Sequence, residues 1–107
     1  MDFGKLRHYI EIQEHTEKRG DSGEVTRGWS TVAAWWASID PLSGRELQYA
    51  QQIHADARVL IRMRPYDGLT PDHRIKFGTR YYNILDVRDM DERGEVSECM
   101  CVEVKGG

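Results

Sequence analysis

The stretch WSTVAAWWASIDPLSGREL, residues 29–47, carries the strongest fold signal in the chain. Its first part alternates as a strand does, with Trp35, Ala37 and Ile39 on one side and Trp36 on the other. Both sides are apolar, which predicts a strand that is covered on both faces or has one face in an interface. The sequence leaves open which of the two tryptophans points inward.

A turn and a short helix are predicted directly after this strand. Pro41 lacks a backbone donor and should end the strand. Ser43 and Glu46 fit the S-x-x-E capping box, with Ser43 as the N-cap residue. An apolar stripe at three-residue spacing then predicts one helix over residues 44–53. The stripe consists of Leu47, Ala50 and Ile53.

Further strand patterns lie on both sides of the helix. They are KLRHYIEIQEH, ADARVLIRMRPY, RIKFGTRYYNILDV with two strands around Gly78, and VSECMCVEV. In the first run, Leu6, His8, Ile10 and Ile12 share one face. The step ILDV breaks the alternation and predicts a bulge. Six or seven short strands with one inserted helix predict the all-β class, a small antiparallel β-barrel or sandwich, as a single domain over residues 1–107.

Two segments lack an apolar pattern and are predicted to be contact elements. TEKRGDSGEVTRG, residues 16–28, is rich in glycine and charge and is expected to be a long flexible hairpin loop. Loops of this length are often functional or disordered. We expect residues 17–27, and the turn segment 66–72, to be extended or poorly ordered in a free subunit and to meet neighbours on assembly.

Composition limits the class of protein. Hydrophobic residues make up 39% and charged residues 31%, which suits a soluble globular domain. No apolar run is long enough to cross a membrane and no signal peptide is visible, so a cytosolic origin is expected. Cys99 and Cys101 match neither zinc-site nor C-x-x-C spacing, and are expected to be buried thiols in a reducing compartment.

No set of residues predicts catalysis, a cofactor or a metal ion. His54 with Asp56, and Asp72 with His73, are read as polar loop residues because no third group completes a constellation. The acidic run DMDERGE, residues 89–95, lacks EF-hand spacing. Phosphate-binding loops and hydrolase motifs are absent from the sequence. The chain is therefore not expected to be an enzyme.

A nucleic-acid-binding small barrel is the alternative hypothesis. Aromatic and basic side chains on strands can form a stacking surface for single strands. The candidate side chains are Trp36, Tyr81, Tyr82, Arg58, Arg62 and Arg64. The formal charge of −3 argues against a general nucleic-acid binder.

The order of these features resembles the phage head–tail joining family, whose members are also called head-closure or head–tail adaptor proteins. The resemblance runs from Gly4 to about Asp89, through GKLRHYIEIQ, WASIDPLSGREL, ARVLIRMR and LTPDHRIKFGTRYYNI. Its most specific positions are Trp36, Ala37, Ser38, Ile39, Pro41, Gly44, Glu46, Arg74, Ile75, Gly78, Tyr82 and Ile84. His73 is a mild departure, since the family often has another basic or polar residue there.

The resemblance implies a structural virion component of a tailed phage or prophage. Family members form a neck ring that joins the head to the tail and closes the DNA exit after packaging. The implied partners are a portal-side adaptor protein, a tail terminator or tail completion protein, and other copies of the chain, which can be monomeric when free. Packaged double-stranded DNA would pass through the ring without sequence-specific binding, and no membrane is involved. The implied location is the host cytoplasm during assembly and then the head–tail interface of the virion.

Candidate interface residues follow from the flexible segments and the tryptophans. They are Glu17, Lys18, Arg19, Asp21, Glu24, Arg27, Trp35, Trp36, Tyr66, Asp67 and Leu69. A ring needs one surface patch of each subunit to meet a different patch of the next, and these residues supply candidates for both patches.

Overall fold

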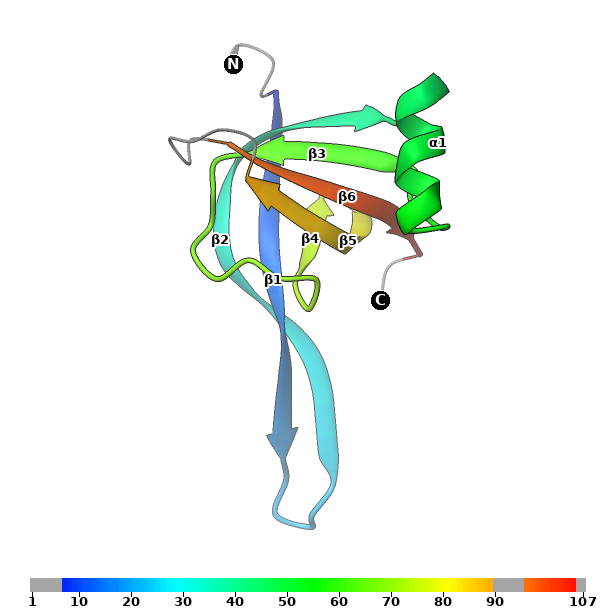
Figure 1. Ribbon diagram of the computed structural model, residues 1–107. Helices are drawn as coiled ribbons and strands as arrows, with labels where there is room; N and C mark the ends of the chain where they lie inside the picture. The colour runs from blue at the N-terminus through cyan, green and yellow to red at the C-terminus, as the bar shows by residue number, and fades with distance from the viewer. Residues whose placement is uncertain (1–6, 90–95, 106–107) are drawn as a thin grey trace.

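The described part of the chain folds into a closed six-stranded antiparallel barrel with one helix on its outside (Figure 1). The computed structural model describes residues 7–89 and 96–105. The elements are β1 (His8–Arg19), β2 (Val25–Pro41), α1 (Gly44–Ile53), β3 (Val59–Met63), β4 (Arg74–Phe77), β5 (Arg80–Asp89) and β6 (Ser97–Val104). Around the barrel the strand order is β1-β2-β3-β6-β5-β4, and β4 closes it against β1. The all-β prediction with one inserted helix is confirmed. Leu6 and residues 90–95 of the acidic run lie outside the described residues.

The barrel interior holds the side chains that the strand alternation predicts. Ile10 and Ile12 of β1 are fully buried and meet Ile61 of β3 in one cluster. The predicted bulge in β5 is confirmed, because the register with β6 shifts between Ile84 and Asp86. This extra residue lets Ile84 and Val87, three positions apart, both contact the core.

A second cluster fixes α1 to the outside of the barrel. Leu42 and Ala50 pack on Leu60 of β3 and Met100 of β6. Successive side chains of a strand point to opposite faces of the sheet. Leu60 and Met100 therefore point outward, away from the interior that their sequence neighbours fill. Ile53, expected on the same helical stripe, is instead 61% exposed.

The predicted capping box does not form. Ser43 is the N-cap residue with extended backbone, but its hydroxyl makes no capping hydrogen bond. Gly44 has a φ of 56°, a left-handed conformation that redirects the chain directly after Ser43. The Glu46 carboxylate lies 4.0 Å from the Arg62 guanidinium, an ion pair with the sheet.

Residues 16–28 are extended, one of the two states expected, but most of them form paired strands rather than a flexible loop. β1 continues to Arg19 and β2 begins at Val25, in register from Gln13 and Thr31 to the end of the hairpin. Only residues 20–24 form a turn, closed by a bond from the Gly20 amide to the Glu24 carbonyl at 2.8 Å. These strands could not be recognised from the sequence. Neither face of the hairpin is buried, so its residues need not alternate between apolar and polar.

The segment 66–72, expected to be extended or poorly ordered, forms compact turns instead. The Leu69 amide donates to the Tyr66 carbonyl at 3.0 Å, which forms a turn at Gly68 with a φ of 85°. Tyr66 lies between Trp35 and His73, with ring centroids 5.9 and 5.8 Å away. These contacts hold the segment against the barrel, because aromatic packing offsets the entropy cost of ordering the loop.

Both cysteines of β6 should be unreactive while the barrel is folded. Burial, with the nearby Glu98 and Asp86 carboxylates, raises the pKa of Cys99 to about 12, and burial raises that of Cys101 well above its usual value. Near neutral pH both side chains are then held as thiols rather than as thiolates, the reactive form. A thiol-specific reagent should modify neither cysteine in native protein and both in guanidinium chloride. Rapid modification of native protein would contradict the inward placement of these side chains.

Candidate functional site: three exposed surfaces

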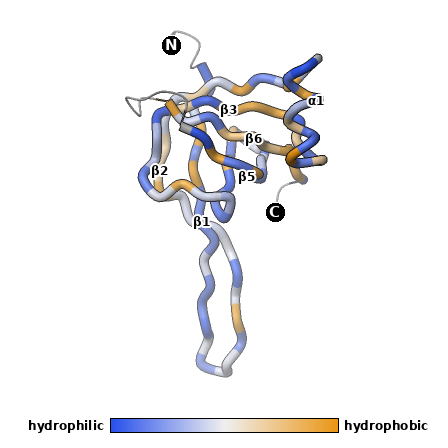
Figure 2. Tube along the Cα trace, in the orientation of Figure 1, coloured by the Kyte–Doolittle hydropathy of each residue, from blue (hydrophilic) through white to orange (hydrophobic). Residues whose placement is uncertain are grey.

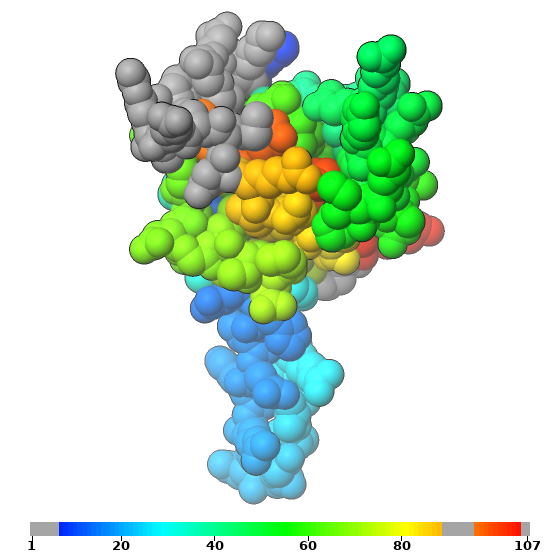
Figure 3. Space-filling model, in the orientation of Figure 1, coloured from blue at the N-terminus to red at the C-terminus, as the bar shows by residue number. Residues whose placement is uncertain are grey.

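The β1–β2 hairpin projects from the barrel as an arm, defined here as residues 14–30 (Figure 3). In the described residues, β1 pairs with β4 only at Glu11–Gln13, and β2 pairs with β3 only from Ala37 onward. The arm strands therefore pair only with each other. The molecule measures 51 × 27 × 26 Å, and because of the arm its long dimension is about twice each of the other two.

The outer half of the arm is polar and solvent-exposed (Figure 2). Glu17 and Arg27 are cross-strand partners, with Nε and Oε1 3.6 Å apart. Val25 is the exposed large hydrophobic side chain there, 44% exposed. An isolated two-stranded hairpin is only marginally stable in water, so this ribbon gains order from any surface that packs against it.

An aromatic and cationic stack fixes the arm to the barrel. The Arg74 guanidinium lies 4.3 Å from the ring centroids of both Trp29 of β2 and Tyr81 of β5. Its Nε donates to Gln13 Oε1 at 2.7 Å, and His15 packs edge-on against Trp29 at 5.2 Å. Burial lowers the pKa of Arg74, with Tyr81 opposing that shift. The stack joins β1, β2, β4 and β5 where the arm leaves the barrel.

Changing Arg74 to Met should loosen the arm without unfolding the barrel. The change removes two cation–π contacts and a charged hydrogen bond, and we expect a cost of about 2 kcal/mol in the free energy of unfolding. Amide hydrogen exchange within the arm should accelerate, because its base loses this anchor. Lys76→Met is the matched control on β4, since Lys76 forms only a partly exposed ion pair with Glu11 at 3.8 Å. Equal effects of the two changes would contradict an anchoring role for Arg74.

An exposed aromatic pair forms the second surface. Trp36 and Tyr9 are cross-strand partners, 54% and 53% exposed, with ring centroids 5.4 Å apart. The open question of orientation is therefore resolved: Trp36 points outward, and Trp35 packs against the core. Tyr9, which the sequence places on the polar face of β1, was missed as a partner of Trp36. Exposed tryptophan and tyrosine are typical of protein interfaces.

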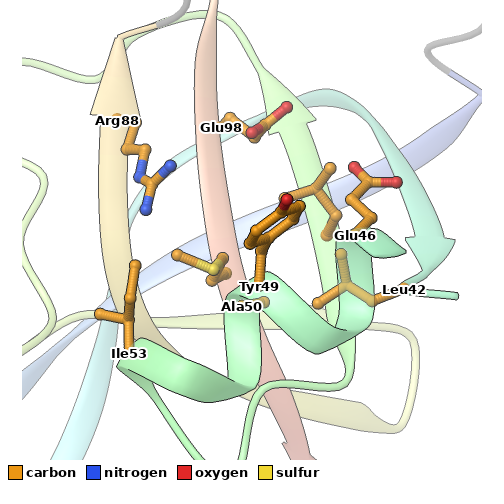
Figure 4. A pocket seen from close by; sticks show the side chains of 9 residues that line it. Leu42, Glu46, Tyr49, Ala50, Ile53, Arg88 and Glu98 are labelled. Atoms are coloured by element: carbon orange, nitrogen blue, oxygen red, sulfur yellow. The ribbon is translucent and has the colours of Figure 1, made fainter. Parts of the chain in front are cut away.

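The third surface is a groove of about 160 Å³ beside α1 (Figure 4). Its base is apolar, with Leu60 and Met100 among the lining residues. Tyr49 and Ile53 border it from the helix and are 66% and 61% exposed. Glu98 of β6 lies across the groove from the helix. An apolar base bordered by charged side chains is a composition typical of binding sites.

The residues of the nucleic-acid hypothesis do not form one surface. Tyr82 is fully buried in the core and Tyr81 contacts Arg74. Arg62 is surrounded by three carboxylates, with Glu98 the nearest at 3.0 Å. The other two carboxylates belong to Asp40 and Glu46. The side chains of this hypothesis therefore do not come together as one stacking platform with a row of available cations, which single-strand binding requires.

The structure distributes the interface residues predicted from sequence over separate surfaces. Six lie on the arm, namely Glu17, Lys18, Arg19, Asp21, Glu24 and Arg27. Trp36 lies on the aromatic pair, and Asp67 is exposed on the loop after β3. Trp35, Tyr66 and Leu69 pack against the core and are less available to a partner.

The described residues contain no group of three or more His, Cys, Asp or Glu side chains arranged to hold a metal ion. Within the same ranges, no helix has the length and hydrophobicity needed to cross a bilayer. His73 has a local role, because its Nδ1 accepts from the Thr70 amide at 3.2 Å.

Comparison with known proteins identifies relatives over almost the whole chain. A family model described as phage head completion protein matches residues 1–104. The solution structure of a protein from Shigella flexneri 2a is similar, with 29% identity, a TM-score of 0.78 and 96% of each chain covered. A chain in the virion of a native gene transfer agent particle shares the fold, with a TM-score of 0.58 and 19% identity over 94% of this chain and 97% of that one. The search of curated proteins found no match.

Proposed function

We propose that this chain, which belongs to the phage head completion protein family, is the structural component that completes the DNA-filled head and prepares it for the tail. The family match over residues 1–104 carries this proposal. It agrees with the resemblance in the sequence to head–tail joining proteins. The related chain in a gene transfer agent virion supports a place in the particle rather than a catalytic role.

The proposed location is the neck, in a ring between a portal-side adaptor protein and a tail completion protein. The three surfaces support this arrangement, because a ring subunit must contact its two neighbours and the components above and below it. An arm supplies a contact outside the barrel, while the aromatic pair and the groove supply contacts on its wall. Packaged DNA would pass through the ring without base-specific contact.

Assembly from free subunits also agrees with the charge of the chain. A formal charge of −3 disfavours tight binding to DNA phosphates, so a ring of such subunits can surround the duplex without gripping it. The arm offers polar contacts that keep the free subunit soluble before assembly, in the host cytoplasm.

Cryo-electron microscopy of complete virions tests the proposed location. Density that fits the barrel and its arm should appear between the head vertex and the tail. A tagged chain, labelled through its C-terminus, should place the label at the same junction. Density for the chain only in the tail tip, in the shell or outside the particle would contradict the proposal.

A further inference from the structure

Two groups of side chains carry opposite charges that have no ion-pair partner among the described residues. The arm turn, residues 20–24, contains Asp21 and Glu24 as its charged side chains, and Lys18 and Arg19 directly precede it on β1. On the barrel wall, Arg7 and Arg64 are both exposed. The ion pairs of the described residues involve neither these two carboxylates nor these two guanidinium groups. Each group thus needs a partner from elsewhere or remains solvated.

The two arginines flank the exposed aromatic pair. Arg64 directly follows Met63, which pairs with Ala37, so it comes next to Trp36 across the β2–β3 ladder. Arg7 directly precedes His8, which also pairs with Ala37 on the other side. We call Arg7, Tyr9, Trp36 and Arg64 the aromatic–arginine patch. The nearest carboxylate along β1, Glu11, already pairs with Lys76 and accepts from the Thr31 hydroxyl.

The arm turn cannot reach the aromatic–arginine patch of its own chain. Glu24 ends the turn and Trp36 lies twelve residues further on, within the single strand β2. An extended strand rises about 3.3 Å per residue, which places them roughly 40 Å apart. The arm points straight away from the barrel (Figure 1). A contact between the turn and the patch must therefore join two copies of the chain.

We infer that the acidic arm turn of one copy docks on the aromatic–arginine patch of the next copy. This inference rests on the proposed function and names the self-contact of the ring. Turn and patch are different surfaces, so the contact is heterologous and repeats from subunit to subunit until the ring closes. Tryptophan, tyrosine and arginine are the side chains that most often dominate interface energy, and the two carboxylates match the two guanidinium groups in sign.

Charge reversal on each side, alone and combined, tests the contact. Native and variant chains are supplied to a host that produces heads and tails without the chain, and complete particles are counted. The pair Arg7→Glu and Arg64→Glu, and separately the pair Asp21→Lys and Glu24→Lys, should each lower the yield by roughly tenfold or more. The quadruple variant should recover to within about threefold of native, because two carboxylates again face two cations. Arg45→Glu on the exposed face of α1 is the control and should change little.

The outcomes separate the inference from the proposed function. If particles are completed without any chain, the proposed function fails and the inference fails with it. If the native chain is required but the single-side variants complete particles normally, only the inference fails. A quadruple variant whose yield falls by the product of both losses, rather than recovering, also overturns it.

Crosslinking within assembled particles gives an independent test. Ser22 lies in the arm turn. Ala34 is exposed in β2, and its carbonyl accepts a hydrogen bond from the Tyr9 hydroxyl of the patch at 3.5 Å. Particles that carry Ser22→Cys with Ala34→Cys should give a ladder of linked chains with a bis-maleimide reagent. Ser22→Cys with Thr79→Cys, at the β4–β5 turn, should not. The reverse pattern would overturn the inference.

Discussion

Replacing residues 18–26 with Asn-Gly should leave a folded barrel that no longer completes heads. The replacement removes the outer arm but keeps the Glu17 and Arg27 partners beside a two-residue turn of a type that suits hairpins. Because side chains of the outer arm are exposed, its loss should change the free energy of unfolding by less than about 1 kcal/mol. The yield of complete particles should fall to the level found without the chain.

Thermal unfolding and particle counting on the same variant check both parts of this result. Ser22→Ala, which keeps the whole arm, should behave as native in each measurement. An unfolded replacement variant would mean that the arm is part of the folding unit. A folded variant that still completes particles would remove the arm from the assembly contacts.

Changing Ile61 to Ala should lower the free energy of unfolding more than the substitutions of Arg74, Lys76 and Ile53 do. Ile61 is fully buried in β3 and belongs to the core cluster. Removing three carbon atoms from a closely packed core leaves a cavity, which costs about 3–4 kcal/mol. A domain of this size has only about 5–15 kcal/mol of stability, so the melting temperature should fall by roughly 15 °C or more.

Ile53→Ala provides the matched control for this core change. The substitution is chemically the same, but Ile53 is 61% exposed at the end of α1. We expect it to lower the free energy of unfolding by less than about 0.5 kcal/mol. Similar losses at the two positions, in urea unfolding of purified protein, would contradict the core that the barrel defines.

Period-two patterns predicted the barrel because each of its strands has one face in the core. Ile10 and Ile12, and the thiols of β6, are buried as their spacing indicates. The bulge in β5 was predictable because ILDV breaks that spacing. Ile53 was misplaced on the buried stripe because a helix end can leave the sheet, which periodicity does not show.

The arm was not predictable as paired strands, since no buried face imposes a pattern on it. Its cross-strand pairing follows from the short turn at residues 20–24, where Gly23 has a φ of 84°. Arg74 was noticed only through the family resemblance. Its place between Trp29 and Tyr81 depends on four strands that meet in the folded chain. Such a contact is set by topology and has no local signal.

The surfaces followed from the sequence only in part. The two adjacent tryptophans marked a candidate interface, but the choice of Trp36 required the register with Tyr9. The groove beside α1 had no sequence signal, because its base and its rim come from separate elements. The aromatic–arginine patch likewise combines β1, β2 and the end of β3.

Electron microscopy of particles assembled without the chain tests the proposed function most directly. The expected result is separate populations of DNA-filled heads and tails, which join when purified native chain is added. Complete, infectious particles in the absence of the chain would contradict its role in head completion.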